Sequence, residues 1–222
     1  SKVTVFSSAV DEQAVLNDAF DRAMDYAVDG IVDSADADTI TVKRQQCTNN
    51  FFRALYAGLG ISTDEDAKQL IQCYVPVIAF VDNDGVYIQY SDYDSTGALN
   101  RVWSKKYTFT TEKTISIGTG PNDYLTFGIT YTLNDNVTVI LNGKIYNGKY
   151  NELYDAYKDS DDDTEKSVFA QPVFKDSVQF DLERDSTVTD TIIKTVGYFV
   201  NRHNTIATRY GIQYSFYLPT SV

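Results

Sequence analysis

A single histidine, His203, limits the chemistry that this chain can support. Nucleophilic triads and dyads need a histidine beside the serine or cysteine nucleophile, and histidine-rich zinc sites need several. His203 lies on the apolar stripe of a predicted helix, so we interpret it as a half-buried structural residue. The sequence therefore indicates no Ser-His-Asp, Cys-His or multi-histidine site.

Carboxylates are the most abundant reactive groups. The chain has 31 acidic residues, and composition alone then supplies some pair suited to glycoside hydrolysis. Because no spacing singles out one pair, we expect no enzyme activity. An enzyme with a carboxylate pair in a cleft is kept as the third hypothesis.

Two acidic segments have the spacing of oxygen ligands in a calcium loop. Asp92 and Asp94 open the first, in which Trp103 occupies the position of the usual bidentate Glu. The second has the acid spacing but no turn glycine, and consists of Asp159, Asp161 and Asp163. We interpret both as solvated loops and expect no cofactor, with calcium as the one candidate metal.

Two cysteines, Cys47 and Cys73, flank a predicted turn between two helices at residues 59–62. An antiparallel helical pair closed there brings the two thiols side by side. A disulfide between them would stabilise the fold by about 3.5 kcal/mol and would require an oxidising compartment. Two buried thiols are the alternative interpretation.

The elements that would position these residues begin with a strand–turn–strand pattern at residues 74–90. The run 75–81 is almost continuously apolar, which is typical of a central strand covered on both faces. The run 86–90 alternates, so we expect one wet face. Between them, residues 82–85 (D-N-D-G) tolerate the positive φ angles of a tight hairpin.

Helical patterns precede this hairpin. Residues 8–32 carry an apolar stripe, which we expect to pack on a sheet or on a neighbouring subunit; its members are Leu16, Phe20, Ala23 and Ala27. A second helix is predicted at 41–59, with Gly60 as its cap. A third is predicted at 63–73, with Ser62 and Glu65 as a capping box.

From Tyr107 the hydrophobic period changes to two, which predicts several further strands up to residue 141. Asn-Gly pairs at 142–143 and 147–148 predict turns. A short helix is predicted at 150–158, an acidic loop at 159–165, a long helix at about 184–209 ended by Gly211, and a closing strand at 212–218.

These elements predict an α+β fold with a long N-terminal helix, a helical hairpin, a central antiparallel β-sheet of five or six strands, and a long C-terminal helix packed on one face. We expect one extracytoplasmic domain over residues 1–222. Its helical part is 1–73 and its sheet part is 74–149 and 168–222, with 150–167 as a helix–loop insertion.

The net charge of −12 excludes two classes of partner. Nucleic acid and anionic membrane surfaces both attract clusters of Lys and Arg. No apolar run reaches the ~20 residues of a membrane-spanning helix. The sequence opens at Ser1 without Met, so we expect a processed or truncated chain whose membrane contact is made only through an upstream anchor.

Five segments resemble an uncharacterised family of bacterial membrane-anchored surface proteins associated with Tad-type pilus and type II secretion-like genes. They are 50–55 (N-F-F-R-A-L), 74–78 (Y-V-P-V-I), 84–88 (D-G-V-Y-I), 201–207 (N-R-H-N-T-I-A) and 210–219 (Y-G-I-Q-Y-S-F-Y-L-P). The chain departs from the family's pattern in lacking a hydrophobic N-terminus. The resemblance implies a bacterial cell-surface or secreted location and no particular reaction.

Two functions follow as expectations. The first is a non-enzymatic, pseudopilin-like extracellular structural subunit. Its expected partners are other protein subunits, including further copies of this chain. The second follows from a weaker architectural similarity to Cache-type sensor domains, which bind small ligands in a pocket on the sheet. Here the pocket would be lined by Tyr87, Tyr90, Trp103 and Tyr107.

Overall fold

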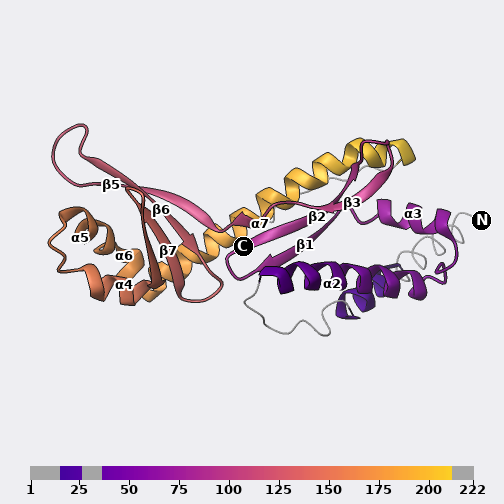
Figure 1. The fold of residues 1–222 in the computed structure, drawn as a ribbon, viewed down its shortest axis with the longest axis horizontal. Coiled ribbons are helices and arrows are strands. Elements are labelled where there is room, and N and C mark those ends of the chain that lie inside the picture. The colour runs from indigo at the N-terminus through magenta and orange to yellow at the C-terminus, as the bar shows by residue number, and fades with distance from the viewer. Residues whose placement is uncertain (1–15, 27–36, 212–222) are drawn as a thin grey trace, which may run out of the picture. The chain divides into compact units, whose positions relative to one another are not determined.

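The computed structural model describes residues 16–26 and 37–211. The chain divides into two compact units, Ser1–Ile78 and Ala79–Val222, whose elements are drawn in Figure 1. The fold is α+β, as the sequence predicts. The predicted helical part ends at residue 73, five residues before the boundary between the units, and the single-domain organisation stays a prediction. None of the described helices is long and apolar enough to cross a bilayer.

The first unit is helical. It contains a helix at residues 16–26, α2 at Ala37–Gly58 and α3 at Glu65–Cys73. The predicted helical hairpin is present, and Gly60 in its turn has a φ of +69°. The predicted capping box is wrong: Asp64 caps α3, because its carboxylate accepts the N–H of Ala67 at 3.0 Å.

A four-stranded antiparallel sheet, called the first sheet below, follows the helices, and the boundary between the two units falls within its first strand. Its strands are β1 (Val77–Asp82), β2 (Gly85–Tyr93), β3 (Leu99–Trp103) and β4 (Tyr107–Thr108). β2 is the central strand, with β1 on one side and both β3 and β4 on the other.

The predicted roles of β1 and β2 are therefore exchanged. The apolar strand β1 lies at the sheet edge and Val81 is 42% exposed, whereas β2 is buried on both faces. The alternation in β2 hides this burial because two of its inward residues are polar: Gln89 and Ser91 are 2% and 4% exposed. Gln89 accepts a hydrogen bond from Arg101 at 3.1 Å, which offsets the cost of its burial.

The hairpin between β1 and β2 has the predicted position but another conformation. No residue from 82 to 85 has a positive φ. Gly85 is needed for space instead, since a Cβ there would lie 2.6 Å from the carbonyl oxygen of Tyr107. Lys106 holds the tip, pairing with Asp82 at 2.7 Å and with Asp84.

A second four-stranded antiparallel sheet follows, in the order β5-β6-β7-β8. Its strands are β5 (Thr110–Ser116), β6 (Tyr124–Tyr131), β7 (Asn136–Leu141) and β8 (Lys144–Lys149). Asn142 and Gly143 form the predicted turn, with φ of 49° and 80°. The second predicted turn is wrong, because Asn147 lies inside β8 and pairs with Thr138.

Phe109 separates the two sheets. Its N–H donates to the carbonyl of Asp84 at 3.0 Å, and its carbonyl accepts the N–H of Tyr131 at 2.9 Å. The chain thus pairs with the first sheet before Phe109 and with the second sheet after it. The prediction of one central sheet of five or six strands is wrong for this reason.

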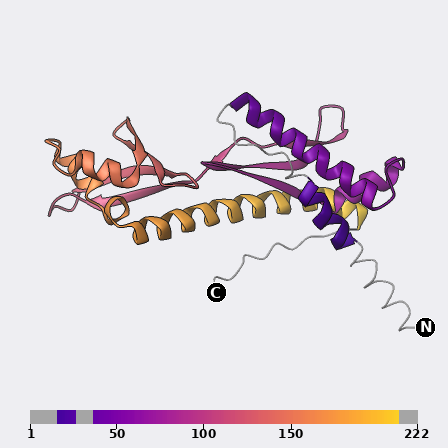
Figure 2. The same cartoon turned by 90° about the horizontal axis from the view of Figure 1, so that it is seen from below.

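Four helices complete the second unit: α4 (Tyr150–Tyr157), α5 (Asp163–Phe169), α6 (Pro172–Lys175) and α7 (Ser177–Ala207). α7 is the predicted long helix, but it begins seven residues earlier because Asp176 caps it. It contacts β2 and β4 of the first sheet and β5 and β6 of the second, as Figures 1 and 2 show. α7 ends at Ala207, and a 3₁₀ helix, η1 (Thr208–Tyr210), continues to Gly211, whose φ of +73° ends the helical segment. The predicted strand at 212–218 lies outside the described residues.

Candidate interaction surfaces and pockets

The predicted apolar stripe of the N-terminal helix packs on α2. Ala23 is completely buried, and Leu16 and Phe20 are half-buried. The ring of Phe20 lies 6.1 Å from that of Phe51. The core of this unit contains Ala19, Ala23, Phe51, Phe52, Leu55 and Val75. Ala27, the last predicted member of the stripe, lies outside the described residues.

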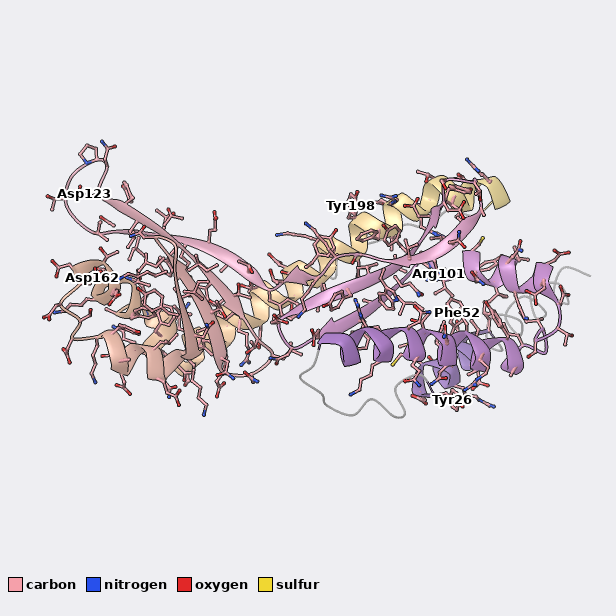
Figure 3. The ribbon with its side chains drawn as sticks, viewed as in Figure 1. Tyr26, Phe52, Arg101, Asp123, Asp162 and Tyr198 are labelled. Carbon is pink, nitrogen blue, oxygen red and sulfur yellow. The ribbon has the colours of Figure 1, made fainter. Side chains whose placement is uncertain are left out.

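Two large apolar side chains flank the buried stripe of this helix, one on each side, and are exposed. Met24 and Tyr26 are 50% and 47% exposed. Arg53 of α2 donates a hydrogen bond to the hydroxyl of Tyr26 at 3.0 Å, and Figure 3 labels this tyrosine. The face opposite the stripe is polar and carries Asp18, Asp21 and Asp25. Met24 and Tyr26, at the margins of the stripe, are exposed apolar side chains through which this helix could contact a second protein.

The two cysteines are thiols in the structure. Cys47 on α2 is half-buried and Cys73 at the end of α3 is buried. Burial raises the pKa of the Cys47 thiol above its ordinary value, which lowers its reactivity at neutral pH. The disulfide between Cys47 and Cys73 stays a prediction.

The four aromatic residues of the predicted ligand pocket lie on two faces of the first sheet. Tyr107 pairs with Val86, which places it on the same face as Tyr90. Trp103 pairs with Gln89, which places it on the opposite face with Tyr87.

The Tyr90 face is filled by α7. Phe199 of α7 lies 4.4 Å from the ring of Tyr90 and 6.1 Å from that of Tyr107. The structure therefore brings Tyr90 and Tyr107 together but not all four rings.

Among the described residues, cations lie over four tyrosine rings of the first sheet. The ammonium of Lys106 lies 5.6 Å from the ring centre of Tyr87. The guanidinium of Arg202 lies 5.2 Å from the ring centre of Tyr90. The guanidinium of Arg209 lies 4.9 Å from the ring centre of Tyr93, and the ammonium of Lys105 lies 5.6 Å from that of Tyr107. Sequence reasoning missed these pairs, because about a hundred residues separate each arginine from its ring.

The first predicted calcium segment is a hairpin loop held by its own carboxylate. Asp94 accepts hydrogen bonds from Thr96, Ala98 and Asn100. The bond from Thr96 contributes most to lowering the pKa of Asp94. Asp92 pairs with Arg202 of α7 at 2.6 Å, so the two carboxylates have separate partners.

The second predicted calcium segment is exposed. Asp159, Asp161 and Asp163 all lie on the surface beside Asp162, which caps α5 by accepting the N–H of Thr164 at 2.9 Å. Figure 3 labels Asp162. Across residues 16–26 and 37–211, no three His, Cys, Asp or Glu side chains are close enough together to hold a metal ion.

A hydroxyl-lined groove of about 400 Å³ lies between β5 and α7. Asp190 and Lys194 form an ion pair at 3.2 Å on its α7 side. Its other lining residues carry hydroxyl groups: Thr110, Thr111, Ser186, Thr187, Thr191 and Thr195. A smaller hollow of about 290 Å³ lies in the helical unit, beside Phe52 and Arg53. Neither contains the predicted pocket residues.

Two glutamates organise the side-chain contacts of the second unit. Glu183 of α7 pairs with Lys113 and accepts the hydroxyl hydrogen of Tyr131 at 3.2 Å. Burial and the neighbouring Glu183 carboxylate raise the pKa of Tyr131. This contact joins α7 to β5 and β6.

The second glutamate, Glu165, lies at the start of α5. It accepts hydrogen bonds from Tyr146 at 2.7 Å and Ser160 at 2.9 Å, and it pairs with Lys144 at 3.2 Å. These bonds, with that from Tyr146 the largest, lower the pKa of Glu165. Both glutamates therefore act as structural anions between elements.

His203 is 2% exposed, so it is fully buried rather than half-buried as predicted. Its place on the inner side of α7 agrees with the structural role inferred from the sequence.

No protein-family model, curated protein or solved structure matches this chain.

Proposed function

We propose that this protein is a non-enzymatic extracytoplasmic structural subunit of a bacterial pilus- or secretion-associated assembly, similar to a pseudopilin. Its partners are other protein subunits, copies of itself among them, and it meets the membrane only through an upstream anchor. The resemblance of segments 50–55 and 201–207 to surface proteins of such systems motivates this location.

The observation that carries the proposal is the pair of exposed apolar side chains on the helix at residues 16–26. Ala19 and Ala23 are buried on α2, whereas Met24 and Tyr26 are about half exposed. In a pseudopilin-like assembly, the N-terminal helix joins neighbouring subunits while the sheet region faces outward. The exposed apolar side chains of this helix are the contacts that such joining requires.

Affinity purification from the native bacterium tests this function. A tagged, chromosomally expressed protein should co-purify with other subunits of one envelope assembly, identified by mass spectrometry. A Met24→Asp, Tyr26→Asp variant should fold normally and lose them. The matched control is Leu70→Asp, because Leu70 is similarly exposed on α3 at 45%. Recovery of the same partners with the double variant would contradict the proposal.

The hydroxyl-lined groove favours a second candidate, a sensor of small polar ligands. Its volume of about 400 Å³ lies in the range of small-molecule sites, although such sites are usually more apolar. Thermal unfolding with a panel of sugars, amino acids and organic acids tests this function. A ligand whose stabilisation is lost in Thr111→Val would favour the sensor.

A further inference from the structure

The hydroxyl-lined groove lies where the chain passes from the first sheet to the second. Thr110 and Thr111, which follow Phe109 at the start of β5, form one wall, and α7 forms the other over residues 186–195. Ligand sites are found preferentially where structural parts of a protein meet, and a volume of about 400 Å³ is within their range. The position and size of the groove therefore fit a small-molecule site.

One hydroxyl of the groove belongs to a buried residue and has no protein partner. Thr195 is 7% exposed and lines the groove. Its hydroxyl forms no hydrogen bond with any other described residue. A buried hydroxyl without a partner is costly, so native proteins rarely keep one unless a molecule bound there satisfies it. Thr195 therefore indicates a ligand that forms hydrogen bonds inside this groove.

The α7 wall presents mainly hydrogen-bond acceptors. The hydroxyl of Thr187 donates to the carbonyl of Glu183 at 2.7 Å, and the hydroxyl of Thr191 donates to the carbonyl of Thr187 at 2.8 Å. Because a hydroxyl has one hydrogen, both of these oxygens can only accept a further hydrogen bond. The carboxylate of Asp190 also only accepts. A ligand on this wall must carry several donors, which excludes a carboxylate ligand that can only accept.

The charges of the groove favour a neutral ligand. Asp190 and Lys194 are its two charged lining residues, and they pair with each other at 3.2 Å. A cationic ligand would bring donors, but it would lie beside the Lys194 ammonium while the carboxylate is already paired. A neutral molecule with many hydroxyl groups avoids this repulsion. Its hydroxyls donate to the acceptors on α7 and also accept from Lys194 and Thr195.

We propose that the hydroxyl-lined groove binds a neutral carbohydrate. The inference goes beyond the structural role proposed above, and it rests on the second candidate function, whose ligand class it names. A dissolved sugar and a glycan on a surface share this chemistry. None of the described lining residues is aromatic, so hydrogen bonds alone would hold the sugar, and we expect weak binding.

Saturation-transfer NMR with the full chain tests the inference, because this method detects weak binding. The probes are neutral hexoses, pentoses, N-acetylhexosamines and their disaccharides, first in solution and then displayed on a glycan array. Thr195→Val removes the hydroxyl at nearly constant volume and should weaken binding at least about tenfold. Thr111→Val, on the opposite wall, should also weaken it. Binding in solution identifies a dissolved sugar as the ligand, whereas binding only to the array identifies a surface glycan, and both support the inference.

The matched control is Thr189→Val, which removes an exposed hydroxyl of α7 outside the groove. It should bind like the wild type, and about 0.5 M salt should leave the binding unchanged, because salt does not screen a neutral ligand. Absence of binding to any of these sugars, or equal binding by the wild type and Thr195→Val, would overturn the inference.

A different result would separate this inference from the function on which it rests. If an amino acid or an organic acid binds in place of the sugars, and Thr111→Val loses it, the sensor candidate stands and the carbohydrate assignment is overturned. None of these results affects the co-purification of protein subunits, which depends on the N-terminal helix.

Discussion

Arg202 and Asp92, which are 110 residues apart in the sequence, join the end of α7 to β2 through an ion pair of 2.6 Å. Their side chains are 40% and 36% exposed. Solvent therefore screens the pair, and its coupling should be small. The contact positions α7 on the first sheet more than it stabilises the fold.

The first prediction concerns this pair. A double-mutant cycle with Asp92→Asn and Arg202→Met should give a coupling energy of about 0.5 kcal/mol. Arg202→Met alone should cost more than Asp92→Asn, because it also removes the cation over Tyr90. Urea unfolding gives the free energy of unfolding of the wild type, both single variants and the double variant. Equal losses of stability in the two single variants would contradict a stabilising contact between Arg202 and the Tyr90 ring.

The second prediction concerns the core of the helical unit. Phe20→Asp places a carboxylate against Phe51 and should destabilise this unit by about 2–4 kcal/mol, or prevent its folding. Met24→Asp, four residues further along at an exposed position, should cost less than about 0.5 kcal/mol. Circular dichroism during urea unfolding compares them, and a soluble Phe20→Asp protein of unchanged stability would exclude this packing.

The third prediction separates two reasons for a glycine. Gly85→Ala should cost about 2–3 kcal/mol, because the new Cβ meets the Tyr107 carbonyl and cannot displace backbone cheaply. Gly60→Ala should cost about 1 kcal/mol, because only its φ of +69° opposes a side chain and no atom lies within 4 Å. Thermal unfolding ranks the two variants, and the reverse order would refute the close approach at Gly85.

The fourth prediction concerns acid stability. The pKa of Glu165 is lowered in the folded state by Tyr146, Ser160 and Lys144. The contribution of Glu165 to folding stability is therefore complete above its unfolded-state pKa of about 4.3. It is lost as the pH falls through the lower pKa of the folded state. Glu165→Gln should lower stability by about 1 kcal/mol at pH 7 and flatten the loss below about pH 4.5. Urea midpoints between about pH 3 and pH 7 measure this slope.

Glu152→Gln is the control for that slope, because Glu152 is exposed on α4 and forms no ion pair among the described residues. It should leave the acid limb unchanged. If stability falls equally steeply at low pH in Glu165→Gln and in the wild type, the three contacts do not lower the pKa of Glu165.

Local patterns predicted most of the elements and their turns. Three features depend on neighbouring residues, so their signals are present in short stretches of sequence: the Asn142-Gly143 hairpin, the helical pair around Gly60 and the stop of the last helical segment at Gly211. The sheet arrangement was not predictable in this way. At Phe109 the chain passes from pairing with the first sheet to pairing with the second. The alternation of apolar and polar residues along the chain is the same as in a strand that stays in one sheet.

The burial of polar residues was a second reason why the sequence prediction failed. Gln89 makes β2 look half-solvated, although the hydrogen bond from Arg101 allows its burial at the centre of the first sheet. A third reason was that contacts between residues far apart in the sequence leave no local pattern. Nothing near Tyr93 in the sequence indicates that Arg209 lies over its ring.

Site-specific crosslinking in the native bacterium tests the central claim most directly. Met24→Cys, in a protein whose own cysteines are replaced by Cys47→Ala and Cys73→Ala, should form crosslinked adducts with other envelope subunits when a bifunctional thiol reagent is added. Tyr154→Cys, half-buried on α4 in the other unit, is the control and should form few. Equal adducts from both positions, or none from Met24→Cys, would contradict a subunit that functions through its N-terminal helix.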